Sequence, residues 1–521
     1  MKKKIKRKPQ YKQMALETAV RNPERYIGLL SALKKFEGKI LNDKTLLKIV
    51  SHLYLIGEVS SPEIKINDQT TIEDIKEKVE FVNRTRRADG GFPQGFASRF
   101  WTYMRTPSEL GFVFAQYNKK FLFSEIAKKL INGEIDEQEA FSVQAMKYNR
   151  KSPYRNVSND FNFFRFILKL LLRLREKDKH LSFEQFIVAS FSEDGNVDEM
   201  LRIFENNKFN DFSDAYKFVK KEYKIATSQN TVTKDYPDVI RRVLIISGFI
   251  SIRYSGKKLI QINENKINYI EDLLNTKFQL NKIEKTNAKA YFDKLNSCNK
   301  EFLEIIKKHR KDDKIIAENY INKLFSIIKD YKINEEIIIN SIKKIGTRKH
   351  IIEEFKEIPE PLKLEFYISI LIALKYGKDF VIRPNYKADH IGKPYSHAPG
   401  KKGDIEVFSK NTYWLIEVTL IRNKTQQLNN ETTSVIRHLN TNEEFKNYLD
   451  KYLSFVAPYI HDDTREFYDI SVIKSKMDGY EIRLKPYSID EFVQITSLKE
   501  NFTDMKKYTQ KVFENFKSKL N

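Results

Sequence analysis

The hydrophobic positions of this chain follow helical spacing over much of its length. Between Leu29 and Gly57, apolar residues recur three and four positions apart, which predicts two helices. The run Phe161–Glu176 is almost continuously apolar with arginines interspersed, and at this length it predicts a core helix and not a membrane element. No internal repeat of fixed period accompanies these segments.

Two strand-like hairpins each follow a helical segment. In Leu110–Gly133 two short strands flank the turn Tyr117–Lys120, and Ser124 is placed to cap the next helix. In Tyr236–Asn263 a helix is followed by two strands around the Ser255-Gly256 turn. Because helices followed by a hairpin are the layout of a winged helix, the sequence predicts two winged-helix-like units.

The remainder of the chain changes in character at about residue 350. Residues 283–350 are rich in Lys and Glu with few turn signals, and they predict a helical connector. Pro359 and Pro361 then introduce a new helix, and the pattern becomes alternating helix and strand. The predicted elements are helix Pro361–Tyr376, strands Asp404–Phe408 and Tyr413–Leu420, helix Thr425–Asn440, strand Leu453–Pro458, a further helix, and strand Tyr480–Lys485.

The predicted fold is therefore a multidomain α+β protein, since 521 residues are too many for one ordinary core. Residues 1–135 and 136–282 are predicted to form two winged-helix-like subdomains. Residues 283–350 are the predicted helical linker, and residues 351–521 a C-terminal α/β domain.

The charge balance points to a polyanionic partner. The chain has 93 Lys and Arg against 70 Asp and Glu, a net charge of +23. An AT-rich genome also enriches lysine, but it does not require such a surplus of cations over acids. A surplus of this size favours nucleic acid, which binds cations through counterion release. No amphipathic basic anchor favours a membrane surface instead.

Other features of the composition exclude several classes. No apolar run reaches the length of a membrane span. The basic N-terminus MKKKIKRKPQYK has no apolar segment after it, so it predicts a DNA-attracted arm and not a secretory signal. A single cysteine, Cys298, excludes a disulfide framework and a cysteine-rich zinc site, and it suits a reducing cytoplasm.

Two carboxylates, Asp404 and Glu417, lie in strand-like runs where burial is expected. If the two strands pair as a hairpin, these acids come side by side. Unpaired buried carboxylates are costly, and a divalent cation is one remedy, because Mg²⁺ takes one or two carboxylates with waters and phosphate oxygens. The alternative is that one acid pairs with a cation at the sheet edge: Lys401, Lys402 or Arg422.

The helix predicted after these strands carries further polar candidates. Gln427, Glu431, Ser434 or Val435, and His438 fall on one stripe, so Glu431 could lean over the same site. The alternative is a solvated helix face for Glu431 and a structural role for His438. Glu365, on the helix that opens the domain, fits a surface acid when taken alone.

Candidate DNA contacts occur in a basic, aromatic-rich stretch, RTRRADGGFPQGFASRFWTYMR. Its glycines permit a close-fitting loop, and its arginines suit bidentate contacts to guanine in the major groove. Each arginine is as well explained by ordinary phosphate binding. The candidates are Arg84, Arg86, Arg87, Arg99 and Arg105, with Lys257 and Lys258 in the second hairpin.

Asp404, twelve intervening residues and then Glu417-Val418-Thr419 resemble the PD-(D/E)xK nuclease core in a form that lacks the final lysine. The segments HAPGKKGDIEV, LIEVT, TQQLNNETTSVIRHL and SFVAPYI resemble the catalytic domain of the AlwI family of type IIS restriction enzymes, which includes site-specific nicking enzymes. The recognition half of that family is resembled less specifically, by NPERYIGLLSALKKFEGKI, SELGFVF and residues 247–263. The resemblance implies winged-helix DNA reading and hydrolysis a few bases downstream of a short asymmetric site.

The resemblance also implies residue roles. Asp404 and Glu417 match the metal-binding pair, Glu431 the extra carboxylate that stands where other nucleases use lysine, and His438 its nearby histidine. Glu365 matches the acid on the first helix. With Mg²⁺ as cofactor, the expected ligands are Asp404, Glu417, the Val418 carbonyl and Glu431.

The expected partners are double-stranded DNA and, for the second strand, another copy or a separate catalytic subunit. A tandem winged-helix repressor or replication initiator would explain the charge but leave the acids idle. A repair- or transposon-associated nuclease would explain the acids without sequence-specific reading.

Overall fold

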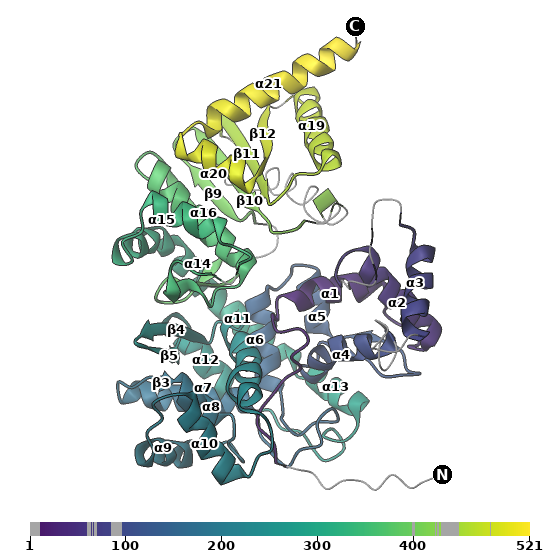
Figure 1. Ribbon diagram of the computed structural model, residues 1–521, viewed down its shortest axis with the longest axis vertical. Helices are drawn as coiled ribbons and strands as arrows, with labels where there is room; N and C mark the ends of the chain where they lie inside the picture. The colour runs from purple at the N-terminus through teal and green to yellow at the C-terminus, as the bar shows by residue number, and fades with distance from the viewer. Residues whose placement is uncertain are drawn as a thin grey trace. The chain divides into compact units, whose positions relative to one another are not determined.

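The computed structural model describes residues 11–59, 64, 66, 70–84, 96–347, 349–398, 402–422, 424, 427–428, 448–479 and 481–520. The chain divides into two compact units, Met1–Arg310 and Lys311–Asn521. The division falls inside the long helix α14 (Asn299–Asp330). Each unit has its own hydrophobic core. In Figure 1 the first unit runs from purple to teal and the second from green to yellow.

The N-terminal unit begins with helices and a small hairpin. Its elements are α1 (Arg25–Leu33), η1 (Lys34–Phe36), α2 (Asp43–Leu55), α3 (Ile72–Arg84), α4 (Phe96–Glu109), β1 (Val113–Phe114), β2 (Leu122–Phe123) and α5 (Glu125–Ile131). Asn42 and Ser124 accept hydrogen bonds from the first turns of α2 and α5, which fixes where these helices begin. Residues 38–41 run antiparallel to 118–121 through the Ile40–Lys120 bridge and flanking hydrogen bonds. The first predicted hairpin is therefore present, with a third segment paired beside it.

The same order recurs in the second half of this unit. The elements are α6 (Glu137–Lys147), α7 (Phe163–Glu176), β3 (Leu181–Ser182), α8 (Phe183–Ala189), α9 (Val197–Asn206), α10 (Phe212–Tyr223), η3 (Thr231–Asp235), α11 (Tyr236–Ile246), β4 (Ile250–Ser255), β5 (Lys257–Ile262), η4 (Glu264–Lys266) and α12 (Ile267–Asn275). The sheet order is β3-β5-β4, with every pair antiparallel. The second predicted hairpin and the predicted core helix α7 are both present.

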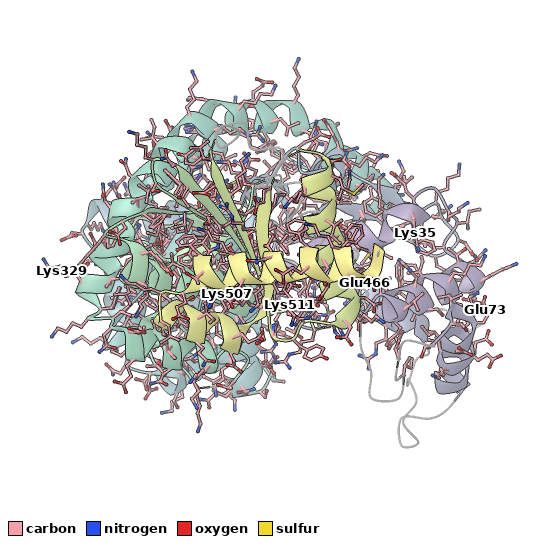
Figure 2. The ribbon with its side chains drawn as sticks, turned by 90° about the horizontal axis from the view of Figure 1, so that it is seen from above. Lys35, Glu73, Lys329, Glu466, Lys507 and Lys511 are labelled. Atoms are coloured by element: carbon pink, nitrogen blue, oxygen red, sulfur yellow. The ribbon has the colours of Figure 1, made fainter. Side chains whose placement is uncertain are left out.

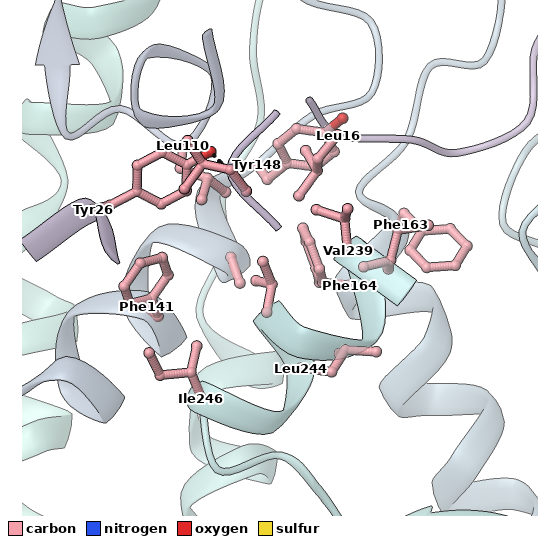
Figure 3. Close-up of a cluster of buried hydrophobic side chains, with 14 of the residues drawn as sticks. Leu16, Tyr26, Leu110, Phe141, Tyr148, Phe163, Phe164, Val239, Leu244 and Ile246 are labelled. Atoms are coloured by element: carbon pink, nitrogen blue, oxygen red, sulfur yellow. Dashed lines mark hydrogen bonds between the residues drawn. The ribbon is translucent and has the colours of Figure 1, made fainter. Parts of the chain in front are cut away.

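A single hydrophobic core joins the two halves of the N-terminal unit. Figure 3 shows side chains from both halves in one cluster, including Tyr26 and Leu110 from the first and Phe163, Phe164 and Leu244 from the second. All five are buried. The two hairpins are therefore parts of one packed body.

The residues predicted as a linker contribute to both cores. Their helices are α13 (Ala288–Ser297), α14 and α15 (Glu335–Lys343). Phe302 and Ile306, in the first half of α14, belong to the N-terminal core. Tyr320 and Leu324, in its second half, belong to the C-terminal core. Residues 311–319 between them include no side chain that is described as buried.

The C-terminal unit is built on a five-stranded sheet of order β12-β11-β10-β9-β6. Its strands are β6 (Val381–Pro384), β9 (Ile405–Phe408), β10 (Thr412–Val418), β11 (Asp450–Ala457) and β12 (Ile482–Ser488). β9 pairs antiparallel with β6 and β10, whereas β10, β11 and β12 are parallel. The described fold is thus mixed α+β, as predicted.

Helices cover both faces of this sheet. Side chains alternate along β10: Trp414 and Ile416 pack with α16 (Glu360–Tyr376) and α20 (Ile489–Ser497), whereas Tyr413 and Leu415 pack with α19 (Asp462–Met477). The long α21 (Asn501–Leu520) contributes side chains to the hydrophobic clusters on both faces of this sheet. It exposes Lys507 and Lys511 on its outer side (Figure 2).

Three strands and two helices of this unit are not predicted by the sequence pattern: β6, β7 (Lys387–Ala388), β8 (Pro394–Ser396), α20 and α21. The strands are short, and Pro384 and Pro394 lie in two of them. The structure also includes a short turn η5 (Glu353–Phe355). No helix in the described part of the chain is both long and apolar enough to cross a membrane.

Candidate active site

The two acids singled out in the sequence, Asp404 and Glu417, lie where β9 begins and β10 ends. These strand ends form one edge of the C-terminal sheet, called the catalytic edge below. β9 and β10 pair antiparallel with Ile405 opposite Ile416. Continued by one pair, this register sets Asp404 opposite Glu417. Side chains of directly opposite residues lie about 5 Å apart in such a pair. The predicted hairpin therefore places these acids side by side.

Two further contacts fix the carboxylates. The backbone N–H of Val418 donates to Oδ2 of Asp404 over 2.8 Å. Oε1 of Glu417 lies over Gly403: a methyl group on Gly403 would be 2.8 Å from that oxygen and 2.2 Å from Cδ1 of Leu415. A larger residue at position 403 would therefore displace the side chain of Leu415 or of Glu417. Glu417 is only 5% exposed, and Asp404 is half-buried.

The adjoining strand ends hold this edge in place. Asn385 follows β6; its backbone N–H donates to the Asp404 carbonyl over 2.9 Å, and its Nδ2 donates to the Gly403 carbonyl over 2.8 Å. On the other side, buried Gln427 donates from Nε2 to the carbonyls of Ile421 and Tyr459, at 2.9 and 2.7 Å. Gln427 thereby ties the chain beyond β10 to the chain beyond β11, where the predicted polar stripe begins.

Glu365 is buried, so the interpretation of this residue as a surface acid is wrong. It lies in the first half of α16 and is 3% exposed. Its Oε1 forms a short contact with Nδ1 of His397, the residue after β8. Its Oε2 is buried and has no hydrogen-bond partner among the described residues. The burial arises because α16 is apolar on nearly every side and is enclosed by neighbouring elements.

A second buried acid near the site has a structural partner. Glu406 is 2% exposed and receives hydrogen bonds from Arg383 on β6, at 2.7 and 2.9 Å, and from the Tyr413 hydroxyl at 3.3 Å. Arg383 stands directly opposite Glu406 in the β6–β9 register. Glu406 is thus an acid whose charge is neutralised by Arg383.

Several predicted site residues lie outside the described part of the chain. These are Glu431, His438 and Lys401, together with most of the helix predicted over Thr425–Asn440. Two of the cations considered as partners for these acids, Lys402 and Arg422, are exposed. The backbone carbonyl of Arg422 accepts a hydrogen bond from His461. Thr419, two residues after Glu417, is buried, and its Oγ1 accepts from the Ile421 N–H.

Within the described ranges no three His, Cys, Asp or Glu side chains gather closely enough to hold a metal ion. Two adjacent carboxylates remain a fitting donor set for Mg²⁺, which commonly takes one or two carboxylates and completes its shell with water and phosphate oxygens. The absence of a side chain at Gly403 lets Leu415 and Glu417 pack closely against its backbone.

Comparison with known proteins places the chain in a family. The model of the AlwI restriction endonuclease family matches residues 108–311 and 277–495, about three quarters of the chain. The chain belongs to the AlwI restriction endonuclease family. It is accordingly a nuclease, and the family supports site-specific cleavage of DNA. No curated protein matches the sequence.

Two solved structures are similar to parts of this AlwI-family chain. One is the small subunit of the heterodimeric restriction endonuclease R.BspD6I, with 22% identity over 34% of this chain and 88% of that one, at a TM-score of 0.27. The other is the BpuJ1 endonuclease binding domain in complex with pyrene- and phenanthrene-modified DNA. It has 12% identity over 56% of this chain and 97% of that one, at a TM-score of 0.34.

The residues predicted to contact DNA are distributed over both hairpin regions. Arg99 and Arg105 are exposed on α4, and Arg105 lies 3.9 Å from Glu17. Lys257 is exposed on β5 and donates to the Asn210 carbonyl, whereas Lys258 lies over the Phe183 ring at 4.4 Å. Arg84 ends α3, and its side chain is outside the described set, as are Arg86 and Arg87.

The helix before the second hairpin differs from α4. Arg241 of α11 is 3% exposed and paired with Asp238, which also binds Arg242 at 2.9 Å. The pKa of Asp238 is lowered even though burial acts to raise it, because the two guanidinium groups stabilise the carboxylate. These arginines are engaged within the protein.

Three residues of the site were not predicted from the sequence: His397, Asn385 and Gly403. His397 and Gly403 lie inside HAPGKKGDIEV, so their place in that motif was an available signal. Asn385 has no such signal, because its role depends on the pairing of a strand that the sequence pattern does not reveal.

Proposed function

We propose that the protein is a type IIS site-specific deoxyribonuclease. Its N-terminal unit would bind a short asymmetric duplex sequence, and its C-terminal unit would hydrolyse phosphodiester bonds a few bases downstream with Mg²⁺. The observation that carries the proposal is the pairing of Asp404 with Glu417 at a sheet edge, in a chain of a restriction endonuclease family.

In this proposal Asp404, Glu417 and the Val418 carbonyl hold Mg²⁺, with Glu431 holding a second ion or orienting water. Mg²⁺ would lower the pKa of a bound water and neutralise charge that develops at phosphorus. The Val418 N–H keeps the Asp404 carboxylate turned toward the strand end. Asn385 holds the backbone of Gly403 and Asp404, so the two acids keep a fixed separation. His438 would contact phosphate or transfer a proton.

A PD-(D/E)xK-like core is supported by the arrangement of strands. An antiparallel hairpin, β9–β10, delivers the two acids, and parallel β11 continues the sheet beside it. A helix that bears an acid, α16 with Glu365, precedes the sheet in the chain. Thr419 replaces the lysine of that pattern, and we assign the lysine's charge role to groups bound to the metal.

Winged-helix recognition is supported by the two hairpins of the N-terminal unit. In each region a segment from earlier in the chain pairs beside the hairpin. Residues 38–41, before α2, pair with residues 118–121, which lead into β2. Likewise β3, before α8, pairs with β5. Arg99 and Arg105 would reach bases or phosphates from α4, while Lys257 and Lys258 would contact phosphates from the second hairpin.

The proposed strand specificity follows from the asymmetry of the chain. One set of Asp404, Glu417 and Glu431 hydrolyses one bond at a time, so the second strand needs repositioning, another copy or a separate catalytic subunit. A nicking endonuclease of the same family is the variant of this function in which the second cut never occurs.

The proposal is tested by incubating supercoiled plasmids with the protein and Mg²⁺ and mapping the ends. We expect an open-circular intermediate nicked always on one strand, ends at a fixed offset from one repeated motif, and no product when the cation is chelated. Linear product should rise more than proportionally with enzyme concentration if copies pair. Dispersed ends would contradict site specificity, and intact plasmid would contradict catalysis.

A further inference from the structure

The carboxylate of Glu365 is held in an unusual way. Glu365 is 3% exposed, and one of its carboxylate oxygens, Oε1, contacts Nδ1 of His397. The other oxygen, Oε2, is buried and has no hydrogen-bond partner among the described residues. A buried polar atom left without a partner is destabilising, because its desolvation is not offset. Such atoms in a native fold call for an explanation, and a water or ligand at the site is a common one.

The chain path brings Glu365 to the same edge of the sheet as Asp404. α16 ends at Tyr376, and a short turn sends β6 back alongside it. Glu365 therefore lies level with the residues that follow β6, since about 1.5 Å per helical residue and 3.3 Å per strand residue give similar lengths. The neighbouring Phe366 confirms this level, because its ring lies 6.2 Å from the ring of Tyr386.

Asn385 then connects this level to the two acids. It immediately precedes Tyr386, and it donates to the carbonyls of both Gly403 and Asp404. Asn385 is thus bonded to the backbone of Asp404, while the next residue, Tyr386, contacts Phe366, the neighbour of Glu365. His397 is also close in sequence, since it lies between β8 and Asp404.

The chemistry of the contact defines what His397 can do. Nδ1 of His397 donates to Oε1 when the carboxylate is ionised, because an ionised carboxylate only accepts hydrogen bonds. The imidazole thereby fixes Oε1, and the geometry leaves Oε2 as the remaining acceptor of Glu365. His397 is itself 26% exposed, so its ring joins the buried carboxylate to the surface of this edge.

We propose that His397 is a positioning residue for cleavage: it holds Oε1 of Glu365 so that Oε2 accepts a hydrogen bond from a water molecule at the catalytic edge. This inference rests on the proposed function. It assigns His397 a role through Glu365, as outer groups orient the residues that meet a metal or its water. The water would satisfy the buried oxygen, and its orientation would depend on the His397 contact.

The test compares three substitutions at His397. His397→Asn keeps an N–H donor near the position of Nδ1, His397→Gln moves the donor outward to the position of Nε2, and His397→Ala removes it. We expect kcat to fall roughly 10- to 100-fold for the Ala and Gln variants, as for other orienting groups. The Asn variant should stay close to the unaltered protein. Affinity for uncleaved duplex, measured without divalent cation, should be the same for all.

A merely structural role would give a different result. If His397 only stabilises the fold, the variants lose melting temperature while kcat at a temperature of full folding stays unchanged. Asn and Gln variants that are equally active overturn the proposal, as does an Asn variant as slow as the Ala variant. If the Ala variant does not fold, the Asn and Gln pair alone decides.

A double-mutant cycle tests whether His397 acts through Glu365. On a Glu365→Gln background, His397→Ala should cause no further loss of kcat, because the carboxylate it positions is already gone. Independent, multiplying losses would overturn the proposal. If the unaltered protein cleaves DNA and the His397 variants are fully active, this inference fails and the proposed function stands. Absence of any Mg²⁺-dependent cleavage by the unaltered protein defeats the proposed function as well.

Discussion

The two compact units place their functional charges in opposite ways. In the N-terminal unit the candidate DNA contacts Arg99, Arg105 and Lys257 are exposed. In the C-terminal unit Glu365 and Glu417 are almost fully buried. Cations that bind a polyanion act from the surface, where they displace counterions. Two of the acids proposed for hydrolysis are instead kept out of bulk water, and a buried acid needs a defined partner.

A second contrast lies within the N-terminal unit. α4 and α11 each precede a hairpin, yet α4 exposes Arg99 and Arg105 whereas α11 buries Arg241 against Asp238. The apolar side chains of α11 form part of the shared core, as Figure 3 shows for Val239, Leu244 and Ile246. The same order of elements therefore exposes arginines on α4 and pairs them within the protein on α11.

The largest expected effect concerns the exposed cations. We expect affinity for duplex DNA to fall roughly 10³- to 10⁵-fold between 50 and 200 mM salt, as for a protein that contacts 6–10 phosphates. Equilibrium binding without Mg²⁺ across a salt series measures the slope. A flat dependence would mean that the net charge of +23 is compositional and not a DNA-binding surface.

The next effect separates the acids of the C-terminal unit. Asp404→Asn should keep an acceptor for the Val418 N–H but remove the charge beside Glu417. Because a bound metal contributes several kcal/mol to such reactions, cleavage should fall by roughly 10³-fold or more. Melting temperature and DNA affinity should change little. Full cleavage by Asp404→Asn, or by Glu417→Gln, would remove the metal-site assignment.

Glu406→Gln is the matched control for this prediction. Glu406 is a buried acid on β9, two residues after Asp404, but it pairs with Arg383. Its neutralisation should lower the free energy of unfolding by about 3 kcal/mol, the scale for breaking a buried ion pair. Cleavage at a temperature where the variant is folded should remain. A loss of cleavage without loss of stability would place Glu406 in the site as well.

Much of this contrast could be predicted from the sequence. The alternation of Tyr413, Leu415 and Glu417 placed Glu417 on a buried face, and the hairpin pattern placed Asp404 beside it. Both hairpins of the N-terminal unit followed from turn residues flanked by apolar runs. These features are local, so a single sequence contains the information for them.

What could not be predicted depends on tertiary packing. Glu365 follows helical spacing like its neighbours, and only the enclosure of α16 on nearly all sides shows that it is buried. A lone histidine in a loop has no periodicity, so nothing in the sequence indicates that His397 meets that carboxylate. The predicted domain boundaries and the roles of Glu431 and His438 stay predictions.

A smaller effect is expected from crowding the acids. Gly403→Ala puts a methyl group 2.2 Å from Leu415 and 2.8 Å from Oε1 of Glu417, so one of them must move. A displacement of about 1 Å at a reacting group costs on the order of 10²-fold in rate. Cleavage assays should show this loss, and crowding should also lower stability by about 1–3 kcal/mol.

Gly479→Ala controls for the general cost of replacing a glycine in this unit. Gly479 has φ of +85°, and no atom lies within 4 Å of the position that a methyl group on it would take. Its replacement should cost about 1 kcal/mol of stability through backbone strain and leave cleavage unchanged. If both glycine variants cleave alike, the close approach of Gly403 to Glu417 has no role in the chemistry.

The smallest effects distinguish the arginines of α4 from those of α11. Arg99→Ala and Arg105→Ala should each weaken binding by about 1–3 kcal/mol if they contact a base, and reduce the salt slope by about 1 if they contact phosphate. Neither should lower the melting temperature, because both side chains are exposed. Arg241→Met should do the reverse, since it removes the buried one of the two arginine partners of Asp238 and leaves the surface unaltered. Binding curves at several salt concentrations, with thermal melting of the same preparations, measure both quantities. Weaker binding by a fully folded Arg241→Met variant would mean that α11 also meets DNA, and the contrast between the two helices would fail.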